Sequence, residues 1–214
     1  MANQTAQEAR FLGFERAEWW FWLKWVLASA AGWLVGLAVG WGTYVGVVTL
    51  VSTATADPRI GEVVGVVVGT ALGLVVFGAV VGTAQWLVLR KRVYRSGWWL
   101  LVTAVGGAVC LVVVFFVGGI VANAIGAPFY LPMLMPVYGA AVGIAQWLIL
   151  RKRVHQSGWW LLAAAAGWAV GCAVDADVGM AVFGALFGAL FGAITGFVLI
   201  LLLRHPIPEV RDPQ

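Results

Sequence analysis

Residues 82–109 read GTAQWLVLRKRVYRSGWWLLVTAVGGAV, and residues 143–170 repeat the pattern without a gap as GIAQWLILRKRVHQSGWWLLAAAAGWAV. In both copies an apolar segment passes through Gln-Trp into an Arg-Lys-Arg turn, and Ser-Gly-Trp-Trp leads into a second apolar segment. Such a pattern is typical of two membrane helices joined by a basic turn on one side of the bilayer. The repeat therefore predicts architecture and orientation, and it carries no reaction chemistry.

The composition points to the same environment. Hydrophobic residues make up 63% and charged residues 10% of the 214 positions, whereas soluble domains have roughly 45–50% and about 25%. The net charge of +4 comes from clusters beside apolar runs, where membrane orientation explains them, so no nucleic-acid partner is expected. Cys110 and Cys172 match no metal or haem spacing and are interpreted as apolar fillers, with a disulfide between them left open.

The apolar pattern predicts an all-α integral membrane protein. A transmembrane helix needs about 20 mostly apolar residues, and six stretches qualify: 19–50, 62–89, 98–122, 131–150, 158–174 and 178–203. Residues 19–204 then form one six-span domain between an N-terminal segment, 1–18, and a tail, 205–214. The first span is expected to be retained, because acidic residues precede it and its apolar run is too long for a signal peptide.

The distribution of charge predicts the orientation of these spans. Arginine and lysine gather in the turns at 90–97 and 151–157, whereas two of the connections on the opposite side carry aspartate. Positive residues favour the cytoplasmic side. With six spans, both termini are therefore expected in the cytoplasm.

The spans also predict three two-helix units. Residues 196–204 align with residues 143–151, which places Leu199 and Ile200 where the earlier copy has Gln146 and Trp147. Spans 1, 3 and 5 then begin at tryptophans, and spans 2, 4 and 6 end at arginines, although the sixth departs from the motif. Parallel repeats of this kind are related by an axis along the membrane normal, here a pseudo-threefold axis.

Glycines at every fourth position predict how the helices associate. Small residues allow the close backbone approach on which helix packing in lipid depends. In span 6 the glycine face fits either packing within the chain or contact with a partner subunit or a second copy. The helix-packing candidates are Gly65, Gly69 and Gly73 in the second span, and Gly184, Gly188, Gly192 and Gly196 in the sixth.

The basic turns and two glutamines are the polar candidates. Gln85 and Gln146 lie inside the membrane edge, where an amide requires a partner, and they could bond each other across the repeat axis. Cations beside indoles suit anionic lipid headgroups, although orientation and an aromatic belt would select the same residues. The headgroup candidates are Arg90, Lys91, Arg92, Trp98, Trp99, Arg151, Lys152, Arg153, Trp159 and Trp160.

The remaining residues argue against catalysis. Between the membrane interfaces there is no Asp, Glu, Arg or His, and no nucleophile–base pair or metal motif is present, so neither an enzyme nor an ion-coupled transporter is expected. Prolines at the start of span 4 would bend that helix, unless they only begin it. They define an apolar-pocket candidate formed by Pro132, Met133, Pro136 and Tyr138.

The motif G-x-A-Q-W-x-x-L-R, followed by a basic turn and a helix that starts with tryptophans, resembles a group of multi-pass membrane proteins of cyanobacteria and green filamentous bacteria without an assigned activity. The resemblance covers residues 82–170 and implies a bacterial inner-membrane location. The function expected is a non-enzymatic accessory or scaffolding subunit that contacts lipid through its basic turns. The alternative is a binding or carrier protein for an apolar molecule such as a lipid, quinone or carotenoid.

Overall fold

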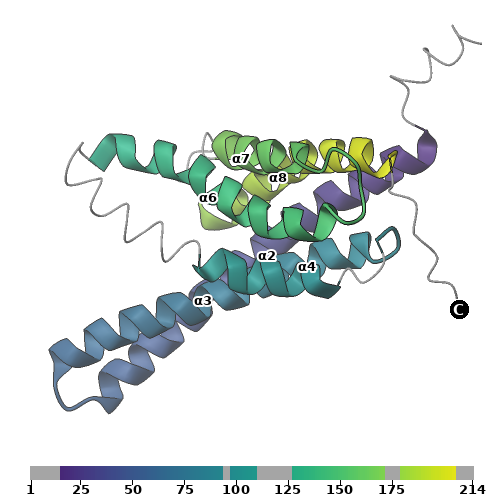
Figure 1. Cartoon of the computed structure of the whole chain (residues 1–214). Helices are drawn as coiled ribbons and strands as arrows, with labels where there is room; N and C mark the ends of the chain where they lie inside the picture. Colours follow the sequence, from purple (N-terminus) through teal and green to yellow (C-terminus); the bar gives the residue numbers. More distant parts are fainter. Residues whose placement is uncertain (1–14, 94–96, 110–126, 172–178, 206–214) are drawn as a thin grey trace, which may run out of the picture.

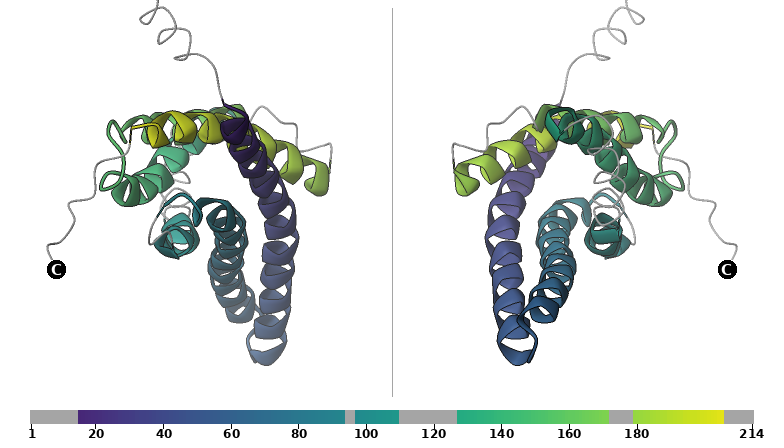
Figure 2. Two further views of the ribbon diagram at one scale, coloured as in Figure 1. Left: turned by 90° about the vertical axis from the view of Figure 1, so that its right-hand side faces the viewer. Right: turned by 90° about the vertical axis from the view of Figure 1, so that its left-hand side faces the viewer.

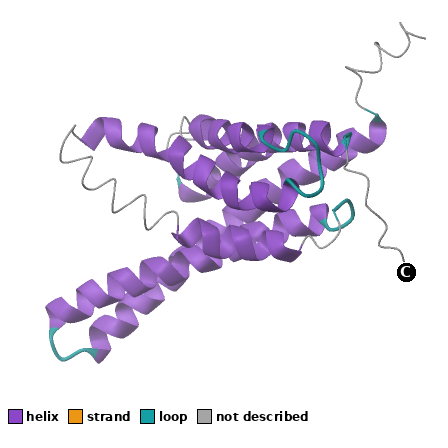
Figure 3. Ribbon diagram, in the orientation of Figure 1, coloured by secondary structure: helices purple, strands orange, loops and turns teal. Residues whose placement is uncertain are grey.

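The computed structural model describes residues 15–93, 97–109, 127–171 and 179–205, and every regular element in these ranges is a helix (Figures 1 and 3). The predicted all-α class is therefore confirmed. The elements are α2 (Arg16–Ala54), α3 (Pro58–Leu89), α4 (Gly97–Leu101) with the π-helical η1 (Val102–Gly106) after it, α6 (Ala127–Leu150), α7 (Trp159–Gly171) and α8 (Met180–Leu203).

Three of the helices, α2, α3 and α8, are long and apolar enough to cross a membrane. They coincide with the first, second and sixth predicted spans. Shorter apolar helical segments at Gly97–Val109, Gly139–Leu150 and Trp159–Gly171 overlap the third, fourth and fifth predicted spans. Parts of the predicted third and fifth spans, 110–122 and 172–174, fall outside the described residues, so the count of six spans stays a prediction.

The connection between α2 and α3 is shorter than the sequence suggested. The helix α2 continues through Ser52 and Thr53, whose hydroxyl groups donate to the carbonyl oxygens of Val48 and Thr49 one turn earlier. The next helix starts at Pro58, a residue suited to a first helical turn. Asp57 caps it by accepting hydrogen bonds from the backbone N–H groups of the second and third residues of α3.

The described helices pack in a closed cyclic order. Each contacts the next along the chain, from α2 to α3, to α4 with η1, to α6, to α7 and to α8, and α8 packs back against α2. In this way the first and last of the described helices, α2 and α8, are neighbours (Figure 2).

The hairpin of α2 and α3 projects from the other helices as an arm (Figures 1 and 2). Glycines of α8 face α2 between Trp22 and Leu37. Farther along α2, Gly40 faces α3. A Cβ atom added at Gly73 of α3 would lie 2.7 Å from the Gly40 carbonyl oxygen. This closeness explains why both positions are glycine, since a side chain at either would separate the helices.

The buried side chains form two clusters. The first surrounds Trp25, Trp99 and Trp160. It contains residues from the starts of α2, α4 and α7 and from the ends of α3, α6 and α8. The second contains Trp33 and Trp168 together with Phe187 and Phe191 of α8. The helix ends that carry the basic turns thus share one aromatic core.

Candidate functional site

Three tryptophans from three different helices meet in the first cluster. Trp25 of α2, Trp99 of α4 and Trp160 of α7 have no exposed surface. The Trp25–Trp99, Trp25–Trp160 and Trp99–Trp160 ring centroids lie 6.0, 6.4 and 5.3 Å apart, all edge-on. This is a favourable aromatic geometry, and we refer to these residues as the tryptophan triad.

Each indole of the tryptophan triad donates its N–H to a polar side chain on an adjacent helix. The Nε1 atom of Trp99 lies 3.1 Å from Gln85 Oε1, and that of Trp160 lies 3.2 Å from Gln146 Oε1. Trp25 makes the corresponding bond to Thr195 Oγ1 on α8, at 3.1 Å. A buried indole N–H requires such an acceptor.

The two glutamines also donate hydrogen bonds to neighbouring helices. Gln85 Nε2 lies 3.3 Å from Ser29 Oγ on α2, and Gln146 Nε2 lies 3.1 Å from Thr103 Oγ1 in η1. Their hydrogen bonds in the described structure therefore differ from the expected direct bond between the amides, because each glutamine is held between the helices on either side of it.

The contacts of α8 match those of α3 and α6 with a shift of one helical turn from the predicted alignment of residues 196–204. A Cβ atom at Gly82, Gly143 or Gly192 would lie within 3.1 Å of the Cβ atom of Thr103, Ala164 or Ser29, respectively. Gln85, Gln146 and Thr195 follow these glycines by three residues each. Thr195, and not Leu199, thus occupies the glutamine position, and sequence reasoning missed it because α8 lacks the Gln-Trp motif.

The basic turns repeat a stacking contact. The Arg90 guanidinium carbon lies 5.3 Å from the Trp86 ring centroid, and Arg151 has the same distance to Trp147, a cation–π arrangement. Arg90, Lys91, Arg92, Arg151 and Lys152 are exposed, whereas Arg153 is half-buried.

The tryptophans after the basic turns divide into two kinds. Trp98 and Trp159 are 64% and 59% exposed and are placed where a headgroup could contact them. Trp99 and Trp160 are fully buried in the tryptophan triad. Their assignment as headgroup contacts is therefore wrong, because successive residues on a helix point about 100° apart and only one of each pair can face outward.

The predicted glycine positions lie at helix contacts within the chain. Gly65, Gly69 and Gly73 face α2. The four glycines of α8 do so as well, with Gly188 placed so that a Cβ would lie 2.6 Å from the Ser29 carbonyl oxygen. Of the two alternatives for this face of α8, the structure has packing within the chain, because α2 covers the glycines.

The start of α2 and the end of α8 are also joined by an ion pair. Arg204 donates from Nε to Glu18 Oε1 at 2.8 Å and from Nη2 to Oε2 at 2.6 Å. These hydrogen bonds raise the pKa of the Arg204 guanidinium. A two-point contact of this kind fixes the relative position of two helices more than a single bond does.

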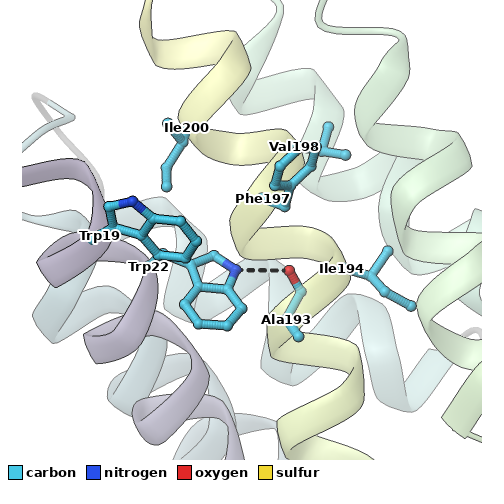
Figure 4. Close-up of a pocket in the computed structure, with 7 residues that line it drawn as sticks. All are labelled: Trp19, Trp22, Ala193, Ile194, Phe197, Val198 and Ile200. Atoms are coloured by element: carbon cyan, nitrogen blue, oxygen red, sulfur yellow. Dashed lines mark hydrogen bonds between the residues drawn. The ribbon is translucent and has the colours of Figure 1, made fainter. Parts of the chain in front are cut away.

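An apolar groove lies between the start of α2 and the end of α8 (Figure 4). Its volume is about 430 Å³, and Trp19, Trp22 and Phe197 are among its lining residues. Trp22 Nε1 donates to the Ala193 carbonyl oxygen at 3.0 Å, which directs the indole across the groove. A second groove of about 470 Å³ shares Trp19 and Trp22 and is also lined by Arg16.

The predicted pocket at Pro132, Met133, Pro136 and Tyr138 falls on the backbone of α6, but these side chains lie outside the described residues. Within the described ranges no group of three or more His, Cys, Asp or Glu residues could hold a metal ion. Comparison with known proteins yields no match to a family model, a curated protein or a solved structure. The resemblance noted from the sequence therefore stays a prediction.

Proposed function

We propose that the protein is a six-span membrane protein with cytoplasmic basic turns that serves as a non-enzymatic scaffolding subunit, with the α2–α3 arm as its contact surface. The observation that carries the proposal is the length of α2, whose second half belongs to the arm. The helix α2 has 39 residues, about 58 Å at a rise of 1.5 Å per residue, whereas the hydrocarbon core is about 30 Å thick.

The exposed surface of the arm is mostly apolar, although the charged side chains of Arg59 and Glu62 are exposed near its tip. Trp41, Leu50, Ile60 and Val63 are each more than half exposed. Tilting shortens the span of a long helix across the bilayer, but an apolar arm that leaves the hydrocarbon still requires cover. The helix of a second membrane protein supplies such cover.

Two glycines on the arm provide a place for that helix. Gly42 and Gly46 on α2 have no described atom within 4 Å of an added Cβ, in contrast to Gly40 of the same helix. They form an open Gly-xxx-Gly pair, the arrangement with which transmembrane helices approach one another closely. The occupant proposed is an apolar transmembrane helix of another subunit or of a second copy.

Native mass spectrometry after mild solubilisation tests this proposal. The wild-type protein is expected to carry a stoichiometric partner or to self-associate, and G42L/G46L is expected to lower the assembled fraction about tenfold, since leucine blocks close approach. G158L is the control, because Gly158 is equally open but lies in the turn before α7, outside the arm. A strictly monomeric wild type, or equal assembly in both variants, would contradict the proposal.

A second candidate function, binding of an apolar molecule, is favoured by the groove at Trp19 and Trp22. Its volume of about 430 Å³ falls in the roughly 300–1,000 Å³ range of ligand sites. The cation of Arg16 in the adjoining groove suits the phosphate of an anionic lipid. We propose a lipid whose acyl chain lies against Phe197 as the occupant.

Lipid analysis of the purified protein tests the second candidate. A193F is expected to reduce the retained anionic lipid several-fold, because the new ring fills the groove. L186F adds the same ring to an exposed position on α8 and is expected to leave retention unchanged. Equal retention in the two variants would contradict lipid binding at this groove.

A further inference from the structure

A small cavity lies in the interior, where the glutamines and the second aromatic cluster meet. Its volume is about 40 Å³, and Gln85, Gln146 and Thr103 line it together with Trp33, Trp168 and Gly107. One water molecule requires about 10–15 Å³ of such volume, so the cavity has room for about three. Gln85 and Gln146 are 1% and 2% exposed.

The cavity coincides with a local departure from the repeat. Gly107 occupies the position of Trp168 in the second copy, and Ala-Gly-Trp at 31–33 places Trp33 at the corresponding position of the first span. Two of the three equivalent positions thus carry an indole that lines the cavity, and the third carries no side chain. The missing indole leaves space on one side.

The backbone departs from the repeat at the same place. Residues Val102–Gly106 form a π-helical segment, whereas the corresponding part of α7 is regular α-helix. Thr103, within that segment, donates to the Trp99 carbonyl oxygen and accepts from Gln146. Short π-helical segments are frequent at functional sites, and here one carries the hydroxyl group that lines the cavity.

The two amides retain hydrogen-bonding capacity in the described structure. A glutamine side chain has two N–H donors and two acceptor positions. Gln85 donates to Ser29 and accepts from Trp99, and Gln146 donates to Thr103 and accepts from Trp160. Each therefore has one further donor and one further acceptor position, and both residues line the cavity.

We propose that this cavity is a binding site for water, which hydrogen-bonds to the amides of Gln85 and Gln146 and thereby joins α3 to α6. The lining residues contain no ionisable side chain, so the site suits a neutral molecule. Water is the smallest neutral molecule that both donates and accepts, which matches what each amide offers. Buried waters generally bond to about three polar groups, and Thr103 is placed beside the two amides.

NMR cross-relaxation between water and the indole N–H protons of the protein in nanodiscs tests the proposal. The tryptophan triad provides a matched comparison, because its three indoles are equally buried. Trp99 and Trp160 donate to glutamines that line the cavity, whereas Trp25 donates to Thr195, which does not. Cross-peaks to water are expected at Trp99 and Trp160 and absent at Trp25.

A variant strengthens this test. Q146L removes one of the two amides. The water cross-peak of Trp99 is then expected to fall several-fold, although the hydrogen-bond partner of Trp99 is Gln85 on α3 and not Gln146 on α6. Preserved dispersion of the remaining indole resonances reports that the variant is folded. Absent or equal cross-peaks at all three wild-type indoles, or an undiminished Trp99 cross-peak in folded Q146L, would overturn the proposal.

Discussion

At the scale of single residues, neighbouring tryptophans have opposite environments. Trp98 is largely exposed, and Trp99 is completely buried with its N–H bonded to Gln85. The same division holds for Trp159 and Trp160. In each pair one ring is buried in the interior and the other is exposed on the surface. The two adjacent tryptophans are therefore expected to differ in their contribution to stability.

The substitution W99F is therefore expected to lower the free energy of unfolding by about 1–3 kcal/mol, because the buried Gln85 oxygen loses its donor and the smaller ring leaves a void. The neighbouring W98F is the control and is expected to change it by less than about 0.5 kcal/mol, as is usual for surface positions. Denaturant unfolding in detergent micelles compares the two. An equal decrease in the free energy of unfolding in both variants would show that the Trp99–Gln85 hydrogen bond adds no stability.

The sequence predicted one part of this site and missed another. The exact spacing of the two copies identified Gln85 and Gln146 as a related pair, because their flanking motifs match. It could not show which tryptophan of each pair faces inward, since both are apolar and adjacent. Thr195 escaped notice because a threonine in an apolar helix is unremarkable until its hydroxyl is found beside Trp25.

At the scale of helices, contacts between α2 and α8 depend on glycine. The Gly188 position faces the backbone of Ser29 and Ala30, and no side chain fits there without separating the helices. The four-residue glycine spacing predicted this kind of packing. The spacing could not identify α2 as the partner helix, because glycine has no side chain that would select one neighbouring helix over another.

The substitution G188L is expected to lower the midpoint of thermal unfolding by several degrees or to prevent folding, because its Cβ alone would lie 2.6 Å from the Ser29 carbonyl oxygen. A181L adds the same side chain to an exposed position of α8 and is expected to leave the midpoint unchanged. Fluorescence-detected thermal melting in detergent measures both. A similar midpoint in the two variants would contradict the role assigned to this face.

At the scale of the whole molecule, the proposed topology places the basic turns and the α2–α3 connection on opposite sides of the membrane. Lys91 lies in the first basic turn and Arg59 at the start of α3, and both are exposed. The separation follows from the positive-inside rule together with the three helices long enough to span.

Cysteine labelling in intact bacteria tests this topology after Cys110 and Cys172 are replaced by alanine. R59C is expected to react with a membrane-impermeant maleimide added outside, and K91C only after the membrane is permeabilised. Reaction of K91C alone from outside, with R59C unreactive, would show the reverse orientation. Reaction of both without permeabilisation would contradict a membrane-spanning hairpin between them.

The cyclic order of packing bears on where the polypeptide needs to begin and end. The last helix, α8, contacts α2 as closely as consecutive helices contact each other, and Glu18 and Arg204 bring the two ends of the described chain together. A circular permutant that is opened at Gly158 and joined by a linker between the original termini would thus keep every helix beside the same two neighbours. The contacts between the helices therefore do not depend on which of the connections is open.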